Sequence, residues 1–121
     1  AFKEANEQIR CFVIEPEGAA VIAGEALAKP DHPIQGGGYA IAELTMIDRA
    51  LIDGFVRVGG QTAIQTARAL AKEEGIFAGF SSGANVAAAI RLLEGEMEGK
   101  TVAVLICDSG LKYLSTDLWS G

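Results

Sequence analysis

Small polar residues directly follow the most apolar stretch of the chain. Val102–Ile106 is a short apolar run rich in β-branched residues, and it gives way to Asp108, Ser109 and Gly110. Such a run is typical of a strand buried on both faces of a parallel sheet. Open α/β sheets bind ligands just beyond the carboxyl ends of their strands. We therefore expect Ser109 to hold a hydroxyl at the rim of a sheet, where it could contact a ligand.

A second motif, Gly-Phe-Ser-Ser-Gly at 79–83, matches G-x-S-x-G, the nucleophile elbow of serine hydrolases. That motif needs a histidine and an acid later in the chain, and the only histidine is His32, upstream in a proline-rich segment. A hydrolase triad within this chain is therefore disfavoured. The commoner interpretation is a helix whose N-cap is Ser81 or Ser82. A third is a helix N-terminus that faces an anionic ligand.

The run of three glycines at 36–38 is not a Walker loop, because no Gly-Lys-Ser/Thr follows, and it is not G-x-G-x-x-G. It is either a surface turn or a loop whose backbone closes on a flat ligand. One histidine and two distant cysteines, Cys11 and Cys107, offer no metal-ligand cluster, so we predict no metal site.

The 121 residues are enough for one domain with a core, and we expect residues 1–121 to form a single domain. The net charge of −6 and the lack of a basic stripe disfavour nucleic acid as a partner. No apolar run approaches the roughly 20 residues that span a bilayer, so no membrane contact is expected. No signal peptide is predicted. Two isolated cysteines indicate a reducing compartment, and we predict a cytoplasmic protein.

Apolar periodicity and the positions of glycine and proline predict alternating strands and helices. Strands are expected over 9–15, 55–58 and 102–106, an extended piece over 76–80, and helices over 1–8, 18–28, 40–52, 61–74 and 81–93. Pro16 is expected to end the first strand, and Gly75 the helix over 61–74. This alternation predicts a three-layer α/β domain with a mainly parallel sheet and helices on both faces.

Three segments occur together in one order and spacing: Ile-Gln-Gly-Gly-Gly-Tyr at 34–39, the stretch 75–89 around Gly-Phe-Ser-Ser-Gly, and Asp-Ser-Gly-Leu-Lys-Tyr-Leu-Ser-Thr at 108–116. In this arrangement the chain, from Ala1 to Trp119, closely resembles the C-terminal portion of the cysteine synthase/cystathionine β-synthase family. The resemblance implies the C-terminal domain of a pyridoxal-phosphate (PLP) enzyme of fold type II.

The resemblance also implies β-replacement chemistry. O-acetylserine or serine loses its β-substituent, and sulfide or another thiol adds to give cysteine or cystathionine. The implied cofactor is pyridoxal 5'-phosphate, and the implied assembly is a homodimer. Related PLP enzymes, such as a serine/threonine dehydratase or a diaminopropionate-forming synthase, remain alternatives, as does a non-catalytic α/β binding module. The residues at 108–116 favour the synthase.

Ser109 matches the family's serine that forms a hydrogen bond with the pyridine nitrogen of PLP. A neutral hydroxyl does not force that nitrogen to carry a proton, so the ring is a milder electron sink that suits elimination. In this family the glycine loop lies by the cofactor and substrate. Gly36 is thus expected to contact the cofactor, Gly38 the substrate, and Tyr39 to act as a gate near the entrance.

The sequence departs from the family pattern in two places. Gly37 replaces a larger aliphatic residue, and Cys107, which we interpret as a small apolar residue at a strand end, stands where proline is usual. The family's Schiff-base lysine and phosphate loop match nothing here. We therefore expect a C-terminal fragment with no catalytic residue of its own, inactive alone. The lysines that fail to match are Lys3, Lys29, Lys72, Lys100 and Lys112.

Overall fold

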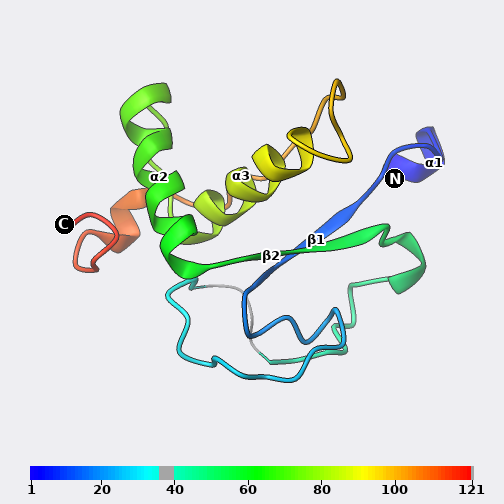
Figure 1. The fold of residues 1–121 in the computed structure, drawn as a ribbon, viewed down its shortest axis with the longest axis horizontal. Coiled ribbons are helices and arrows are strands. Elements are labelled where there is room, and N and C mark those ends of the chain that lie inside the picture. Colours follow the sequence, from blue (N-terminus) through cyan, green and yellow to red (C-terminus); the bar gives the residue numbers. More distant parts are fainter. Residues whose placement is uncertain (36–39, 121) are drawn as a thin grey trace.

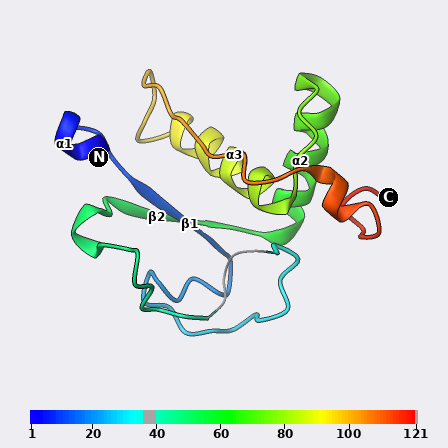
Figure 2. The same ribbon diagram turned by 180° about the vertical axis from the view of Figure 1, so that it is seen from behind.

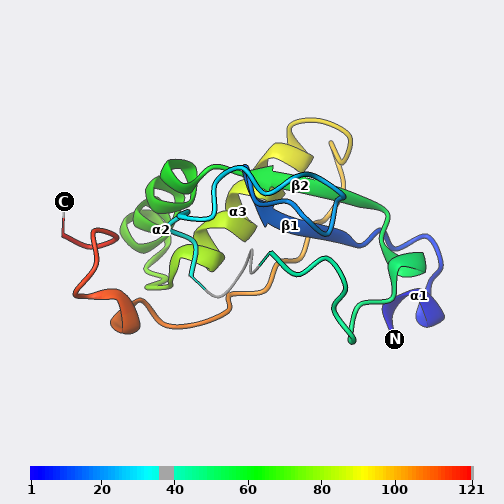
Figure 3. The same cartoon turned by 90° about the horizontal axis from the view of Figure 1, so that it is seen from below.

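The structure is a computed structural model of the chain, and it describes residues 1–35 and 40–120. Two parallel strands pair in its middle, with Phe12 opposite Gly54 and Pro16 opposite Val58 (Figure 1). The named elements are α1 (Phe2–Ala5), β1 (Phe12–Pro16), η1 (Arg49–Leu51), β2 (Gly54–Val58), α2 (Gly60–Glu74), α3 (Phe80–Leu93) and η2 (Gly110–Tyr113). The two termini lie at opposite ends of the molecule (Figures 1 and 3).

The predicted α/β class with a parallel sheet is confirmed. The strands expected over 9–15 and 55–58 are β1 and β2, and α2 ends at Gly75 in a left-handed conformation, φ 71°. Over the part of the chain that the structure describes, α2 and α3 share one side of the strands, and the loops over 17–35 and 40–53, with the single turn η1, cover the other (Figures 1 and 2). No described helix is long and apolar enough to cross a membrane.

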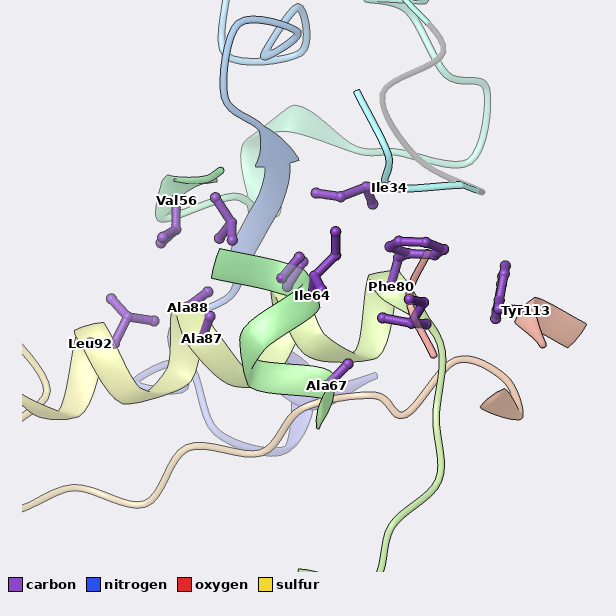
Figure 4. Packing of buried hydrophobic residues seen from close by; sticks show 13 residues of the cluster. Ile34, Val56, Ile64, Ala67, Phe80, Ala87, Ala88, Leu92 and Tyr113 are labelled. Atoms are coloured by element: carbon purple, nitrogen blue, oxygen red, sulfur yellow. The ribbon is translucent and has the colours of Figure 1, made fainter. Parts of the chain in front are cut away.

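The core lies where α2 and α3 meet the strands. Phe80 and Val58 are fully buried, and the Tyr113 ring meets Phe80 edge-on with centroids 5.2 Å apart (Figure 4). The helices can approach closely because their facing residues are small. Gly83 of α3 lies against Ala63 and Ala67 of α2, and Ala84, Ala87 and Ala88 of α3 are also small and buried.

The helix expected over 18–28 is wrong, because its backbone groups bond elsewhere. Gly18 and Gly24 adopt left-handed conformations, φ 81° and 87°, which a helix cannot include. The buried Glu15 carboxylate at the end of β1 accepts the backbone N–H groups of Ile22 and Ala23, each at 2.9 Å. The segment is therefore a series of turns anchored on the strand.

The helix expected over 40–52 is also wrong, apart from the single turn η1. Asp48 accepts the backbone N–H of Ala50 at 3.0 Å and caps that turn, so its side chain competes with helix formation. Apolar residues that would have formed one helical face are exposed, with Leu44 at 38% and Leu51 at 47%. Without a surface to bury that face, a helix of this length gains little.

The strand expected over 102–106, buried on both faces, is wrong as well. The segment is extended but pairs with no strand among the described residues, and Leu105 is 73% exposed. It runs beside α3 instead (Figures 1 and 2), where the Asn85 side-chain amide donates to the Leu105 carbonyl at 2.9 Å. β-Branched composition alone does not make a strand when no neighbouring strand supplies hydrogen bonds.

Acid is expected to weaken the contacts that Asp53, directly before β2, makes with Lys3 and Cys11 in the N-terminal segment. The Asp53 carboxylate accepts from Lys3 Nζ and from the Cys11 backbone N–H, both at 2.7 Å, and these contacts hold the pKa of Asp53 below its usual 3.8. A carboxyl with a lowered folded-state pKa stabilises the fold above its unfolded pKa, and this is lost as pH falls through the folded value. Melting curves below pH 3.8 should show a smaller acid loss for Asp53→Asn than for wild type. Asp31→Asn, at an exposed site, serves as the control, and equal acid losses in both variants would refute the assignment.

Candidate functional site

The first turn of α3 brings together all three segments that the sequence singled out. Ser81 Oγ donates to the carbonyl of Gln35, immediately before the glycine run, at 2.8 Å. Ser82 Oγ accepts the backbone N–H of Cys107, immediately before Asp108, at 3.0 Å. Two adjacent hydroxyls on one helix thus hold two segments that lie far from it in the sequence.

The loop that carries Ser109 is fixed from several sides. Ser109 forms an isolated antiparallel bridge with Ala78, and the Gly110 N–H donates to the Phe77 carbonyl at 3.1 Å. The indole N–H of Trp119 donates to the Gly110 carbonyl at 3.1 Å, and its ring lies 4.4 Å from that of Phe77. The loop is therefore held beside the start of α3 by backbone and aromatic contacts.

The Ser109 side chain is exposed and caps the short helix η2. Its Oγ accepts the backbone N–H of Leu111 at 3.2 Å, which fixes the oxygen in place. Over the described chain, no acceptor takes the hydroxyl proton. Donation from the Ser109 hydroxyl to a ligand stays a prediction.

The predicted N-cap at Ser81 or Ser82 is wrong. The N-cap of α3 is Gly79, and no side chain caps the helix there. Both serines lie inside the first turn and bond to other segments, so their hydroxyls join the chain's distant parts. The serine in the nucleophile position of G-x-S-x-G is Ser81, and its hydroxyl donates to the Gln35 carbonyl and not to a histidine.

Three of the predicted site residues, Gly36, Gly38 and Tyr39, lie outside the described residues. Their neighbour Gln35 does not, and its contact with Ser81 places the entry to the glycine run against α3. Ser81 is a functional candidate that the sequence does not single out, because its position in Gly-Phe-Ser-Ser-Gly indicates only a helix cap or a nucleophile. The signal that could have found it is the pair of serines between Gly79 and Gly83, directly after an extended segment.

No group of metal-binding side chains exists among residues 1–35 and 40–120. The ammonium of Lys112 lies closest to Ser109 in the sequence, and it pairs with the Asp108 carboxylate at 3.4 Å. The described residues offer neutral hydroxyls that suit a pyridine nitrogen. They include no lysine that matches the family's Schiff-base lysine. They therefore fit contact with the ring of PLP and not the anchoring of its aldehyde.

Parallel α/β folds commonly bind ligands where loops gather beyond the ends of their strands, and this chain has such a fold with polar loops gathered at the start of α3. Residues 1–108 match the family described as pyridoxal-phosphate dependent enzyme. The chain belongs to this family, whose cofactor is pyridoxal phosphate. Ser109 lies one residue beyond the matched range.

Within this family the chain is similar to several named proteins. Cysteine synthase of Staphylococcus aureus (strain Mu50) is 39% identical over 119 residues, covering 98% of this chain and 37% of the relative. O-ureido-L-serine synthase of Streptomyces lavendulae is 39% identical over 117 residues, covering 97% of this chain and 35% of that protein. The crystal structure of cysteine synthase from Entamoeba histolytica superposes with a TM-score of 0.89 at 36% identity, covering 98% of this chain and 34% of that one. The chain thus spans little more than a third of the length of these relatives.

Proposed function

We propose that residues 1–121 are an incomplete C-terminal cofactor-binding domain of a PLP-dependent β-replacement enzyme. The enzyme would make cysteine or cystathionine from O-acetylserine or serine and sulfide or a thiol. The observation that carries this is the junction at the start of α3, where Ser81 and Ser82 hold the segments that end at Gln35 and Cys107. The names of the similar proteins support a synthase, and we extend the proposal to a cytoplasmic homodimer.

When bound, PLP supplies the electron sink for loss of a β-substituent. The role proposed for this chain is to orient the cofactor ring through a neutral hydroxyl. Ser109 is the hydroxyl that the sequence selects, and its oxygen is fixed by the Leu111 N–H. Ser81 is the second candidate because its hydroxyl lies against Gln35, next to the glycine run. Gly36 and Gly38 are proposed to line the cofactor and substrate, and Tyr39 to act at the entrance.

The test compares Ser109→Ala and Ser81→Ala in the complete protein that contains these residues. Each variant is titrated with PLP, followed by visible absorbance, and assayed for cysteine formation from O-acetylserine and sulfide. Loss of a hydrogen bond to the ring is expected to weaken PLP binding about tenfold. The variant that shows this loss identifies the hydroxyl that contacts the ring. Ser115→Ala, at an exposed serine on the same C-terminal segment, is the control.

The outcomes separate the alternatives. A complete protein that binds PLP but releases ammonia and a keto acid from serine or threonine, without using sulfide, is a dehydratase. A complete protein that binds no PLP at all refutes the enzyme and favours the binding module. Wild-type PLP affinity in both serine variants would refute the role assigned to this junction.

A further inference from the structure

Asp108, which no step of the proposed function uses, sits between the extended segment 102–107 and Ser109. Its carboxylate is mostly buried, with the side chain 19% exposed. One oxygen, Oδ2, accepts a short hydrogen bond from the phenol of Tyr113 and a longer one, 3.4 Å, from Lys112 Nζ. We call the pair formed by Asp108 and Tyr113 the carboxylate–phenol latch.

The other oxygen of Asp108 faces the start of α3. Oδ1 is buried and has no hydrogen-bond partner in the part of the chain that the structure describes. It lies so close to Gly79, the N-cap of α3, that a Cβ on that residue would collide with it. The first N–H groups of an α-helix lack intrahelical partners and carry partial positive charge, so a carboxylate placed there is stabilising. α3 has no side-chain cap of its own, and Asp108 Oδ1 lies beside its N-cap residue without a hydrogen bond to it.

Tyr113 connects this carboxylate to the core. Its ring is 5% exposed and meets Phe80, the first residue of α3, edge-on at 5.2 Å. The latch therefore has one anchor on the Ser109 loop and one on the helix that carries Ser81. The two candidate hydroxyls are placed relative to one another through it.

We propose that Asp108 and Tyr113 are positioning residues that fix the spacing between Ser109 and the first turn of α3, and thereby set the affinity for PLP. This inference rests on the proposed function for its ligand. The latch itself is a property of the fold, and it can be tested without any cofactor.

Trp119, the only tryptophan among residues 1–121, provides the cofactor-free measurement once any tryptophan elsewhere in the complete protein is replaced by phenylalanine. Its indole donates to the Gly110 carbonyl beside Ser109, and its ring packs at a tilt against Phe77. A change in the position of the Ser109 loop should therefore shift the emission of Trp119. Loss of stability elsewhere would leave the emission of the folded protein unchanged.

The experiment uses the complete protein with Tyr113→Phe, Asp108→Asn and Lys112→Met. Tyr113→Phe keeps the ring against Phe80 and removes only the hydroxyl that donates to Asp108. It should weaken PLP binding about tenfold and shift the emission of Trp119 in the cofactor-free protein. Asp108→Asn keeps an acceptor for Tyr113 but loses the charge, so its effects should be smaller and in the same direction. Lys112→Met changes a side chain that is 66% exposed. It should leave the PLP affinity within twofold of wild type and the emission of Trp119 unshifted.

Wild-type emission and wild-type PLP affinity in Tyr113→Phe would overturn the proposal. A lower melting temperature in Tyr113→Phe, with both of these readouts unchanged, would also overturn it, because the pair would then be merely structural. If wild-type protein binds no PLP, the proposed function fails, and the emission of Trp119 alone decides whether the latch exists.

Discussion

Replacing Gly83 with alanine is expected to lower the free energy of unfolding by about 3 kcal/mol, the upper end of the usual cost of overpacking. A Cβ at this position would lie 2.9 Å from Ala67 Cβ and 3.0 Å from the Ala67 nitrogen, and closer still to the Ala63 carbonyl oxygen. Two of these obstacles are backbone atoms of α2, which cannot rotate away as a side chain can. The helices must therefore separate.

Urea unfolding of the complete protein measures this loss, with Gly95→Ala as the matched control. A Cβ at Gly95 would meet only the Arg91 carbonyl oxygen, at 3.5 Å, which is an ordinary contact. The control should therefore lie within about 0.5 kcal/mol of wild type, as surface substitutions usually do. Equal stability of the two variants would mean that α2 and α3 do not pack through Gly83.

The elements that the sequence predicts correctly are those whose stability is local or periodic. In α2, small and apolar residues recur at helical spacing, and Gly75 ends the helix in a conformation that glycine adopts readily. In β2, Val56 and Val58 are buried while Arg57 between them is exposed, which is the alternation of a strand. Such patterns are visible without knowledge of the rest of the chain.

The elements that the sequence predicts wrongly depend on contacts from elsewhere. Helical composition over 18–28 yields to the Glu15 carboxylate and to two left-handed glycines, and nothing in the local composition shows that Glu15 is buried. The apolar run 102–106 has the composition of a central strand, but it bonds to the Asn85 side chain instead of a neighbouring strand. Tertiary contacts override propensity over 18–28, whereas for 102–106 the described residues supply no partner strand.

The residues of the candidate site also differ in whether the local sequence indicates them or only the folded chain brings them together. The place of Ser109 directly after an apolar run predicts a hydroxyl that contacts a ligand, which stays a prediction, and in the structure its oxygen caps the short helix η2. Ser81 is not predicted, because its partner Gln35 is 46 positions away and only the folded chain brings the two together. Asp108 and Tyr113, which form the carboxylate–phenol latch, lie only five residues apart in the sequence. Nothing in the sequence indicates that this pair packs against Gly79.

Replacing Gly79 with alanine is expected to open that latch and to lower the free energy of unfolding by about 2 kcal/mol. The added Cβ would lie 2.9 Å from Tyr113 Cδ2, closer to the next ring carbon, and against Asp108 Oδ1. The backbone of Gly79 is extended, with φ −88° and ψ −174°, which alanine also adopts. The loss is therefore steric, and its source is the two members of the latch.

A double-mutant cycle separates this steric origin from a general weakening of the start of α3. Tyr113→Leu removes the obstructing ring, so Gly79→Ala should cost at least about 1 kcal/mol less in that background than in wild type. The emission of Trp119 should shift in Gly79→Ala, because displaced Asp108 carries Ser109 and Gly110 with it. Additive costs in the cycle, with unshifted emission, would mean that Gly79 and Tyr113 do not share a contact. Coupling of the expected size would show that the absence of a side chain at Gly79 allows Asp108 and Tyr113 to pack against the start of α3, beside Ser109.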